Sequence, residues 1–517
     1  MNSDKPPGEH KAASVEIISE RTQVFVAGGG PAGSMTAILL AREGFDVVIC
    51  EKDRFPRYHI GESLLTSAIP LLEFAGVLDR VERHGFVKKF GGFFRIKRDQ
   101  PAGYIDFTKL SRYRHSFQVV RSEFDAILLD HARQCGASVR EETMVVSVDF
   151  EGSRPVAAVT RGPDGSLSRI AFDYFVDATG QAGLLSARYF KNRREEPAFA
   201  NVAVGTYYRG ARPYRDHRGV EHPGAFSMEA LTDGSGWTWA IPLHDGTLSV
   251  GVVVHRDICK ERRRTAASNE VYLAKSLELS PDVSSLIAGA QQEGEFRAWR
   301  DYSYFATSFA GRGFRLAGDA AGFIDPLFSS GVHLAFLGAL SSAATISATL
   351  RGEISEDVAE KFHQRCLSQA YTRFMISVAG FYCQIRNQES LVLPAVSQDN
   401  FQLAFDLIQP VVSGNADVNA DEVPADLLRR AMQYTTASML EAHDIRTNNR
   451  VASILSTRIM DDTVTNRSGS LDGMFIRFER GRLGLERISR IGSAVLSTQK
   501  RIIRGVIAVA AELPQNA

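Results

Sequence analysis

Residues 23–51 read QVFVAGGGPAGSMTAILLAREGFDVVICE, and this stretch decides the fold. Its first apolar run, 23–27, predicts a short buried strand. The segment 31–44 carries apolar residues at helical spacing, and 46–51 predicts a second strand. A strand, a helix and a second strand in such close succession are typical of a βαβ unit, in which the two strands run parallel.

The turn between the first strand and the helix carries glycines at positions 28, 30 and 33, with Ala32 among them. In a dinucleotide site, Gly28 would permit the tight turn, Gly30 would let the backbone approach the pyrophosphate, and Gly33 would let helix and strand pack closely. Glu51 ends the second strand, where a carboxylate can accept hydrogen bonds from ribose hydroxyls. The ordered set predicts a dinucleotide site, and the alternative is an ordinary glycine-rich turn.

Composition excludes several classes of protein. The 517 residues include 60 Lys plus Arg and 60 Asp plus Glu, so no basic field favours nucleic acid or an anionic membrane. The five cysteines form no Cys-x-x-Cys, which predicts neither a disulfide framework nor a metal site and fits a cytoplasmic location. Residues 1–20 lack a signal sequence and predict a disordered tail. No run of about 18 apolar residues predicts a spanning helix, and 505–513 is either a packed last helix or a peripheral amphipathic one.

Two later motifs distinguish between FAD and NAD. Residues 175–180 read FVDATG and 314–322 read FRLAGDAAG, and both are apolar strands that end in small-residue turns. They resemble the DATG and GD motifs of the flavoprotein monooxygenase superfamily. The resemblance implies FAD contacts at Asp177, Gly180 and Asp319, with Asp319 on the ribityl chain, although a plain helix cap is compatible with it. Arg121, in QVVRSEFD, matches the superfamily's helix arginine. The sequence contains no second Gly-x-Gly-x-x-Gly motif at the start of another βαβ unit, so it gives no indication of a nicotinamide-binding domain.

The same resemblance implies an α/β fold of the para-hydroxybenzoate hydroxylase type. Its Rossmann-like FAD-binding domain would be discontinuous, and an antiparallel β-sheet substrate domain would be interleaved with it. From about residue 355 onward, the residue pattern itself predicts a mainly helical C-terminal region, with an acidic loop at 413–425 and a solvated basic helix face at 477–504. The predicted limits are 21–88, 118–198 and 296–355 for the FAD domain, 89–117 and 199–295 for the sheet, and 356–517 for the helices.

The segment 236–242, GWTWAIP, uses two of the three tryptophans. On a strand, Trp237 and Trp239 face the same way, which is typical of aromatics that close a sheet over a core. The Trp-x-Trp-x-Ile-Pro motif in this segment also resembles the signature of the FAD-dependent halogenases. In that family the pair would keep substrate away from the flavin and so suppress hydroxylation.

Two earlier segments also resemble this family. Residues 55–65, FPRYHIGESLL, are similar to the part that covers the flavin, which implies contacts from Arg57, Gly61, Glu62 and Ser63. Residues 85–93, GFVKKFGGF, are similar to the strand that carries the essential lysine, which implies Lys89. If 86–93 is one strand, Lys88 and Lys89 point to opposite faces. Lys88, or a solvated pair without function, is the alternative.

Residues 323–333, FIDPLFSSGVH, resemble the family's Phe-x-x-Pro-x-x-Ser-x-Gly stretch beside the isoalloxazine. This implies that Pro326 lies at the flavin and that the amides of Ser330 and Gly331 hold the halide, as unpaired N–H groups at a helix start can. Phe328 replaces a glutamate of the tryptophan halogenases, which speaks against a tryptophan-type substrate. His333 is either an acid or base or a packed helix residue.

The nearest resemblance is to phenolic and resorcylic halogenases of the radicicol-pathway type, and it extends to GRLGLER at 481–487. It implies that FADH2 and O2 give a flavin hydroperoxide, that chloride attacks it to yield hypochlorous acid, and that Lys89 delivers the chlorine to a phenol. A separate flavin reductase would supply FADH2. Use of bromide, and whether the phenol is free or tethered to a carrier protein, stay open.

Three alternatives share the FAD motifs. A flavin-dependent aromatic hydroxylase would add oxygen at every halide concentration. A flavin-dependent alkene reductase of the geranylgeranyl-reductase type would not consume O2. A non-catalytic flavin-binding protein would keep its function when Lys89 is replaced.

Overall fold

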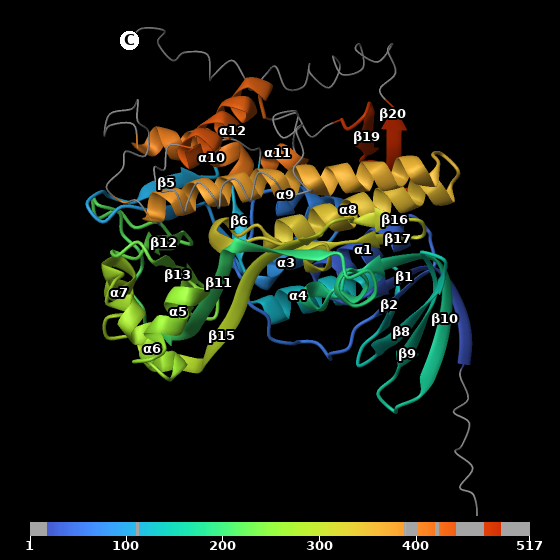
Figure 1. Cartoon of the computed structure of the whole chain (residues 1–517), viewed down its shortest axis with the longest axis horizontal. Helices are drawn as coiled ribbons and strands as arrows, with labels where there is room; N and C mark the ends of the chain where they lie inside the picture. Colours follow the sequence, from blue (N-terminus) through green and yellow to red (C-terminus); the bar gives the residue numbers. More distant parts are fainter. Residues whose placement is uncertain are drawn as a thin grey trace, which may run out of the picture.

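A computed structural model describes residues 18–109, 113–386, 388, 401–418, 423–440 and 470–487. It contains two large sheets covered by helices (Figure 1), which confirms the predicted α/β class. The first strand, β1 (Ile18–Ala27), begins inside the predicted disordered tail, so that prediction is wrong for residues 18–20. Residues 1–17 of the predicted tail lie outside the described residues.

The first sheet brings the three flavin-type motifs to one edge. Its strand order is β16-β17-β10-β1-β2-β7, and β1 runs parallel to both β10 and β2. Ala27, Asp177 and Leu316 end β1, β10 and β17 in matching register, so the three turns that follow them meet. The other bounds are β2 Val47–Cys50, β7 Ser138–Arg140, β8 Met144–Glu151, β9 Arg154–Arg161, β10 Leu167–Asp177, β16 Ala310–Gly311 and β17 Phe314–Leu316.

Helices α1 (Pro31–Arg42), α4 (Arg121–Gln134) and α8 (Gly331–Leu350) cover one face of this sheet. Alternate residues of β1 divide between the two faces: Val24 and Val26 pack in the core with these helices, whereas Phe25 belongs to the core on the opposite side. By length and composition, α8 could cross a membrane, which the sequence pattern did not predict, but 94% of its apolar window is buried, as in a core helix.

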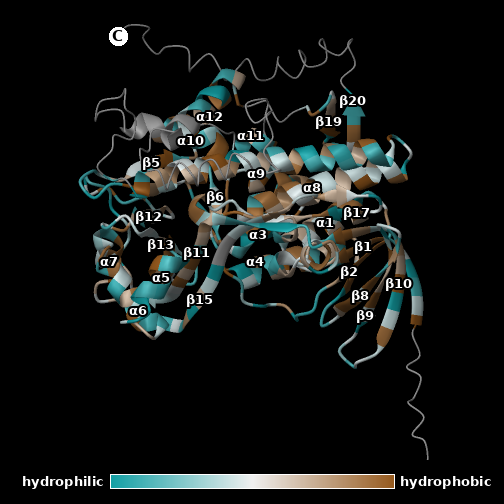
Figure 2. Cartoon of the chain, in the orientation of Figure 1, coloured by the Kyte–Doolittle hydropathy of each residue, from teal (hydrophilic) through white to brown (hydrophobic). Residues whose placement is uncertain are grey.

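The second sheet has the order β18-β15-β11-β14-β13-β12-β4-β5. Helices α5–α7 pack on one face of it, and their ribbons carry both hydrophilic (teal) and hydrophobic (brown) residues in Figure 2. The predicted antiparallel sheet at 200–255 is confirmed, and β11 and β15 extend it beyond the predicted limits at 199 and 295. The bounds are β4 Gly91–Arg95, β5 Gly103–Asp106, β11 Arg193–Arg209, β12 Phe226–Ala230, β13 Gly236–Pro242, β14 Thr247–His255, α5 Arg256–Arg262, α6 Asn269–Leu277, α7 Pro281–Ile287, β15 Gln291–Ala306 and β18 Gly322–Phe323.

The expectation that 86–93 forms one strand is wrong. Residues Val87–Lys89 form β3, which pairs with β6 (Ser116–Gln118), whereas β4 begins at Gly91 and pairs with β12 in the large sheet. The chain therefore changes sheets directly after Lys89. Alternation along β3 places Lys88 and Lys89 on opposite sides of the strand, and the change of sheet after Lys89 determines what packs around them.

The C-terminal region begins with the long helix α9 (Glu356–Arg386), which lies along α8 (Figure 1), followed by α10 (Phe401–Val412) and α12 (Ala425–Leu440). Two expectations need correction. The predicted acidic loop contains a short helix, α11 (Asn415–Val418), and the start of the predicted basic helix face is a hairpin of β19 (Met474–Arg477) and β20 (Gly484–Arg487). Residues 488–517, with the apolar stretch at 505–513, lie outside the described residues.

The GRLGLER motif is far from the other motifs in the sequence, but the hairpin brings it into contact with α1 and with the residue that follows α8. Glu43, which caps the C-terminus of α1, accepts hydrogen bonds from the backbone N–H groups of Gly481 and Leu483 at 2.8 and 3.0 Å. Arg351, which follows α8, donates to the same carboxylate at 2.6 Å and to the carbonyl of Leu483 at 2.9 Å. The motif thus fastens the β19–β20 hairpin to the two helices that begin at the predicted FAD and halide turns.

Candidate active site

The glycine-rich turn is packed too tightly for larger residues. Gly28 has a φ of +104°, and a Cβ there would lie 2.3 Å from the carbonyl oxygen of Ala178. A Cβ on Gly33 would lie 1.8 Å from the carbonyl oxygen of Gly28. Gly30 caps α1 in an extended conformation, and Pro31 is the first residue of the helix. The first N–H groups of a helix have no partner within it and can bind an anion. This is the cradle that a pyrophosphate needs.

Glu51 and Arg57 flank this cradle. The Glu51 carboxylate accepts hydrogen bonds from the N–H of Gly29 at 2.7 Å and of Asp53 at 2.9 Å, which fixes it beside the turn. Arg57 pairs with Asp125 at 3.0 Å, and its guanidinium lies 3.4 Å from the position of a Cβ on Gly30. A carboxylate and a guanidinium at these positions suit the ribose and the phosphates of a dinucleotide.

Arg121 anchors the predicted flavin-covering segment to α4. Its guanidinium donates to the carbonyl oxygens of Ile60 and Gly61 at 2.8 and 3.2 Å, and it pairs with Asp125 at 2.9 Å. Burial acts to raise the pKa of Asp125, but Arg121 outweighs it and holds the pKa below the ordinary value. Gly61 has a φ of +104°, the left-handed conformation that glycine favours.

The carboxylate in the turn after β10, that of Asp177, is hydrogen-bonded within its own turn. Asp177 accepts hydrogen bonds from the N–H and hydroxyl of Thr179 at 3.1 and 2.6 Å and from the N–H of Leu185 at 2.6 Å. These bonds shape the turn at Gly180, which suggests support of the turn rather than direct contact with a cofactor. Ala32 packs against the third turn, where a Cβ on Gly318 would lie 2.9 Å from it.

Asp319 fits the ribityl chain of FAD. Burial raises its pKa to about 6, although Arg121 and Arg193 act to lower it. Within the described part of the chain, no hydrogen bond to its carboxylate is formed, so its oxygens retain their capacity to accept. A half-buried carboxylate with open acceptor sites is suited to bind hydroxyl groups. The three turns and their carboxylates therefore fit FAD.

Lys89 is fully buried, whereas Lys88 is exposed. The amine of Lys89 donates to the hydroxyl of Ser63 at 2.7 Å and to the carbonyl oxygen of Leu64 at 2.9 Å. It lies over the rings of Phe226 and Phe107, 4.5 and 5.0 Å from their centroids. Burial lowers the pKa of Lys89 well below its ordinary value. Ser63 thus turns its side chain toward the lysine, while Glu62 beside it accepts a 2.7 Å bond from the hydroxyl of Tyr207.

A series of phenylalanines leads from Lys89 toward α8. Phe226 contacts Phe94 edge-on with a centroid distance of 5.2 Å, and Phe94 lies 5.8 Å from Phe328. Phe328 in turn packs against Phe381 of α9 at 4.7 Å. The position that departs from the tryptophan halogenases is therefore part of a buried aromatic cluster (Phe94, Phe226, Phe328, Phe381 and Phe405).

The two tryptophans face the same side of β13, as alternation predicts, and their rings lie 6.2 Å apart. Trp239 occupies a slot between Gly205 and Gly251, where a Cβ would lie 2.8 and 2.1 Å from the indole. Its Nε1 donates to Ser249 at 3.1 Å. Both indoles are buried in the main core, as is typical of aromatics that close a sheet over a core.

A hydrogen-bonded group beside Trp237 was not predicted. The hydroxyl of Tyr382 accepts bonds from Trp237 and Asn201, each at 2.8 Å, and donates to Asp325 at 2.8 Å. Burial raises the pKa of Asp325. Asp325 lies within the FIDPLFSSG segment that resembles the halogenase motif, so the sequence alone could have identified it as a candidate site residue. Tyr382 has no local motif, because its relevance depends on how α9 packs.

The loop before α8 ends in the predicted halide residues. Pro326 opens a short helix, Ser329 adopts a φ of 59°, and Ser330 caps α8, which begins at Gly331. Among the described residues, no heavy atom outside the chain neighbours and the helix's own backbone lies within 4 Å of a Cβ built on Gly331, and none forms a hydrogen bond with the buried Ser330 hydroxyl. Open space beside the first N–H groups of a long helix suits an anion.

His333 is a buried residue with both ring nitrogens engaged. Nδ1 lies 2.8 Å from the hydroxyl of Ser67, and Nε2 lies 3.1 Å from the carboxylate of Asp417. Asp417 also pairs with Arg373 at 2.6 Å. Ser67, which precedes α2 (Ala68–Ala75), is itself fully buried. Of the two interpretations of His333, these contacts favour the packed helix residue, which ties α11 to the first turn of α8.

Comparison with known proteins supports the same assignment. The family model of the FAD binding domain matches residues 21–375. The chain is 45% identical to the flavin-dependent halogenase armH4 of Armillaria mellea, over 81% of this chain and 82% of that protein. It is 42% identical to the sulochrin halogenase gedL of Aspergillus terreus, over 78% of this chain and 77% of that protein.

A solved structure agrees. The myxobacterial chondrochloren halogenase CndH, described as a variant of FAD-dependent halogenases, superposes with a TM-score of 0.66 and 30% identity. The match covers 81% of this chain and 97% of that one. The glycine-rich cradle, the two supporting turns and these relatives agree, and the chain belongs to the family of FAD-dependent halogenases.

Proposed function

We propose that this enzyme chlorinates an electron-rich phenol, with Lys89 as the residue that transfers chlorine. The observation that carries the proposal is the environment of Lys89. Its amine is fully buried, it is held by the neutral oxygens of Ser63 and Leu64, and burial lowers its pKa well below the ordinary value. A lowered pKa increases the share of the amine that is unprotonated, and the unprotonated amine has a free lone pair, which an ammonium ion lacks.

Reduced FAD, when bound, supplies the electrons for the conversion of O2, chloride and a proton into hypochlorous acid and water. The Lys89 amine then either donates a hydrogen bond to hypochlorous acid or exchanges a proton for chlorine, which forms an N–Cl bond and releases water. From the N–Cl form, the ring carbon of the phenol takes the chlorine and the amine regains a proton. From hypochlorous acid held by the hydrogen bond, the ring carbon takes the chlorine and the oxygen leaves with the ring proton as water. The lysine ends the cycle unchanged.

Chloride would be held by the N–H groups of Ser330 and Gly331, where open space borders the start of α8. Trp237 and Trp239, whose rings are held by Tyr382 and Ser249, would separate the flavin from the aromatic substrate and so suppress hydroxylation. Water excluded from this buried region would also spare hypochlorous acid from loss before it reaches Lys89.

The aromatic cluster supports a small, nearly neutral substrate. Phe328 stands where the tryptophan halogenases have a glutamate and packs against Phe94 and Phe381, so a substrate that meets this cluster would find apolar and edge-on aromatic contacts. A phenol, which we propose to be polyketide-derived, suits such a cluster, and one relative is named a sulochrin halogenase. We propose that the phenol is bound free, in the cytoplasm, and that a separate flavin reductase provides FADH2.

The test incubates the enzyme with a flavin reductase, NADH, FAD, chloride and a panel of small phenols, and reads products by mass and isotope pattern. We expect a monochlorinated phenol whose yield depends on chloride. Lys89→Ala should abolish chlorination while FAD stays bound, and Lys88→Ala, the matched change one position earlier on the exposed side, should retain it. Gain of oxygen at every chloride concentration would assign the hydroxylase function instead, and full activity of Lys89→Ala would contradict the role of the lysine. Turnover only of carrier-bound phenols would contradict the free-substrate proposal.

A further inference from the structure

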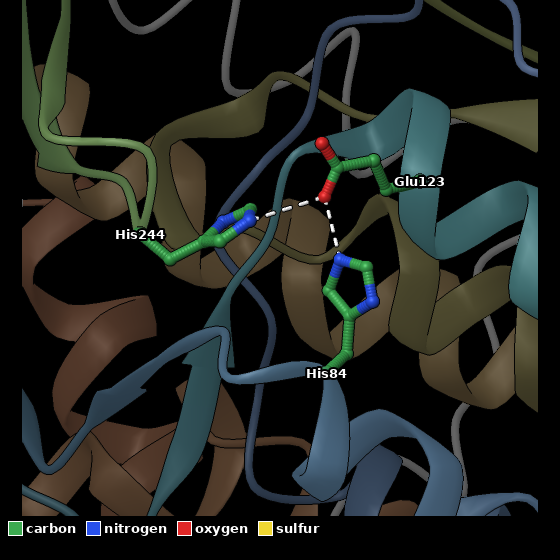
Figure 3. Close-up of side chains that lie close together, drawn as sticks. All are labelled: His84, Glu123 and His244. Atoms are coloured by element: carbon green, nitrogen blue, oxygen red, sulfur yellow. Dashed lines mark hydrogen bonds and ion pairs between the residues drawn. The ribbon is translucent and has the colours of Figure 1, made fainter.

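Two histidines and a glutamate converge at the junction of three elements, away from the contacts of Lys89 (Figure 3). His84 ends α3 (Leu78–His84), Glu123 lies in the first turn of α4, and His244 lies in the turn between β13 and β14. The Nε2 atoms of His84 and His244 lie 2.6 and 3.1 Å from the same carboxylate oxygen of Glu123. All three potential ligand atoms lie within 4.8 Å of one another.

We propose that His84, Glu123 and His244 form a binding site for a divalent transition-metal ion, with Zn²⁺ as the ion of best fit. Imidazole nitrogen and carboxylate oxygen are preferred ligands of Zn²⁺, and two histidines with one carboxylate are a recurrent set. With metal–ligand distances of about 2.0–2.2 Å, tetrahedral ligands lie roughly 3.3 Å apart. Small rotations of these side chains would open the observed spacing to that value.

The rings of the two histidines are held in place by a buried neighbour. Phe86 lies 4.4 Å from the His84 ring and 5.1 Å from the His244 ring, measured between centroids. The two histidine rings lie 5.4 Å apart at an angle of 64°. Rings that are fixed in this way lose little freedom when they bind an ion, which favours a preformed site.

The site would be open on one side and would join distant parts of the chain. The side chains of His84, Glu123 and His244 are 33%, 38% and 20% exposed, so water can occupy a fourth position. The ion would connect the helix that bears Arg121 with the turn of the tryptophan strand and with the segment leading to Lys89. It would therefore stabilise the contact between the flavin-binding part and the antiparallel sheet, whatever substrate the enzyme uses.

The sequence patterns predicted no metal site, because that expectation relied on the spacing of cysteines. The three ligands are 39 and 121 positions apart along the chain (123 − 84 and 244 − 123), with no short motif among them. A hydrogen-bonded cluster without metal is the competing explanation, since each histidine can donate a hydrogen bond from Nε2 to the carboxylate of Glu123. The two explanations differ for Glu123→Gln, which keeps an oxygen that accepts hydrogen bonds but removes the charge that attracts a cation.

The experiment uses the full-length enzyme without a histidine tag, freed of metal by chelation, and titrates it with Co²⁺ and Zn²⁺. We expect one Co²⁺ per chain with visible d–d absorption, displacement of Co²⁺ by Zn²⁺, and a rise in Tm of about 2 °C or more with excess Zn²⁺. The variant His84→Ala/His244→Ala should lose all three responses. Glu123→Gln should weaken Co²⁺ binding at least about tenfold, since even a lost supporting partner costs a metal site 10–100-fold.

His217→Ala, a change at an exposed histidine elsewhere on the surface, is the matched control and should bind Co²⁺ as the parent does. Absence of Co²⁺ absorption in the parent would overturn the proposal, as would equal binding by the double variant. If the double variant does not fold, Glu123→Gln decides, because unchanged Co²⁺ affinity in that variant would equally overturn the proposal. None of these measurements requires halogenation, so their outcome is independent of whether the enzyme chlorinates phenols.

Discussion

The indole Nε1 of Trp237 donates a 2.8 Å hydrogen bond to the hydroxyl of Tyr382, 145 positions later in the chain. That hydroxyl donates in turn to Asp325, in the loop that leads to the predicted halide residues. The tryptophan strand, helix α9 and the loop before α8 are thus joined through one phenol group. A residue of the C-terminal region, which the sequence motifs leave unassigned, supports two parts of the site at once.

This link predicts non-additive effects of Trp237→Phe and Tyr382→Phe. Each change removes the same hydrogen bond and leaves a buried polar group of its partner without that contact. We expect each single variant to be destabilised, and the double variant to be more stable than the sum predicts by about 1 kcal/mol. Chemical denaturation of the four proteins measures this. Additive losses would contradict a direct coupling.

The bond between Lys89 and Ser63 predicts an effect on turnover. Ser63→Ala removes one of the two oxygens that orient the amine, while the carbonyl of Leu64 still accepts a bond. We expect kcat for chlorination to fall by up to about tenfold, which corresponds to the loss of one hydrogen bond. FAD affinity, measured by fluorescence quenching, should change little. A loss of FAD binding with unchanged turnover of the loaded enzyme would instead place Ser63 at the cofactor.

Gly331→Ala separates halide binding from folding. The space around a Cβ at this position is open, and its φ is not in the left-handed region, so stability should stay within about 0.5 kcal/mol of the parent. The added methyl group would intrude beside the N–H groups that are proposed to hold chloride. The KM for chloride should therefore rise several-fold with a smaller change in kcat. An unchanged chloride KM would argue against this location.

His363 predicts a loss of stability in acid. Its ring is fully buried, with Nδ1 3.0 Å from Ser341 and Nε2 3.0 Å from the carbonyl oxygen of Leu316. Burial, helped by Arg315, lowers its pKa from 6.5 to about 3. Between these values the unfolded chain binds a proton that the folded chain does not, so stability is full above pH 6.5 and falls as the pH drops toward 3.

At pH 5 this loss would amount to roughly 2 kcal/mol from His363 alone. His363→Gln removes the titrating group and keeps a side chain that can hydrogen bond. We expect the drop in unfolding free energy between pH 7 and pH 5 to be smaller in the variant than in the parent. Equal drops would mean that His363 is protonated in the folded enzyme.

Local patterns along the chain were enough to predict much of the fold. The βαβ unit around Gly28, Gly30 and Gly33 and the antiparallel strands at 200–255 are confirmed, because tight turns and alternating apolar residues are set by neighbours in sequence. The prediction of one strand at 86–93 was wrong, because the change of sheet after Lys89 depends on pairing with β6 and β12. The burial of Lys89 follows from that change and from the packing of Phe107 and Phe226 over it.

The sequence by itself determined the family, the cofactor and the order of the motifs, since each motif is a short run whose backbone demands are local. Only the tertiary structure decided which groups meet: Tyr382 with Trp237, Asp417 with His333, and Glu123 with His84 and His244. These partners are far apart in the chain, and no periodicity encodes them. They meet because burying the apolar faces of α8 and α9 and of the two sheets brings those residues together, and a buried or half-buried polar group must then find its partner there.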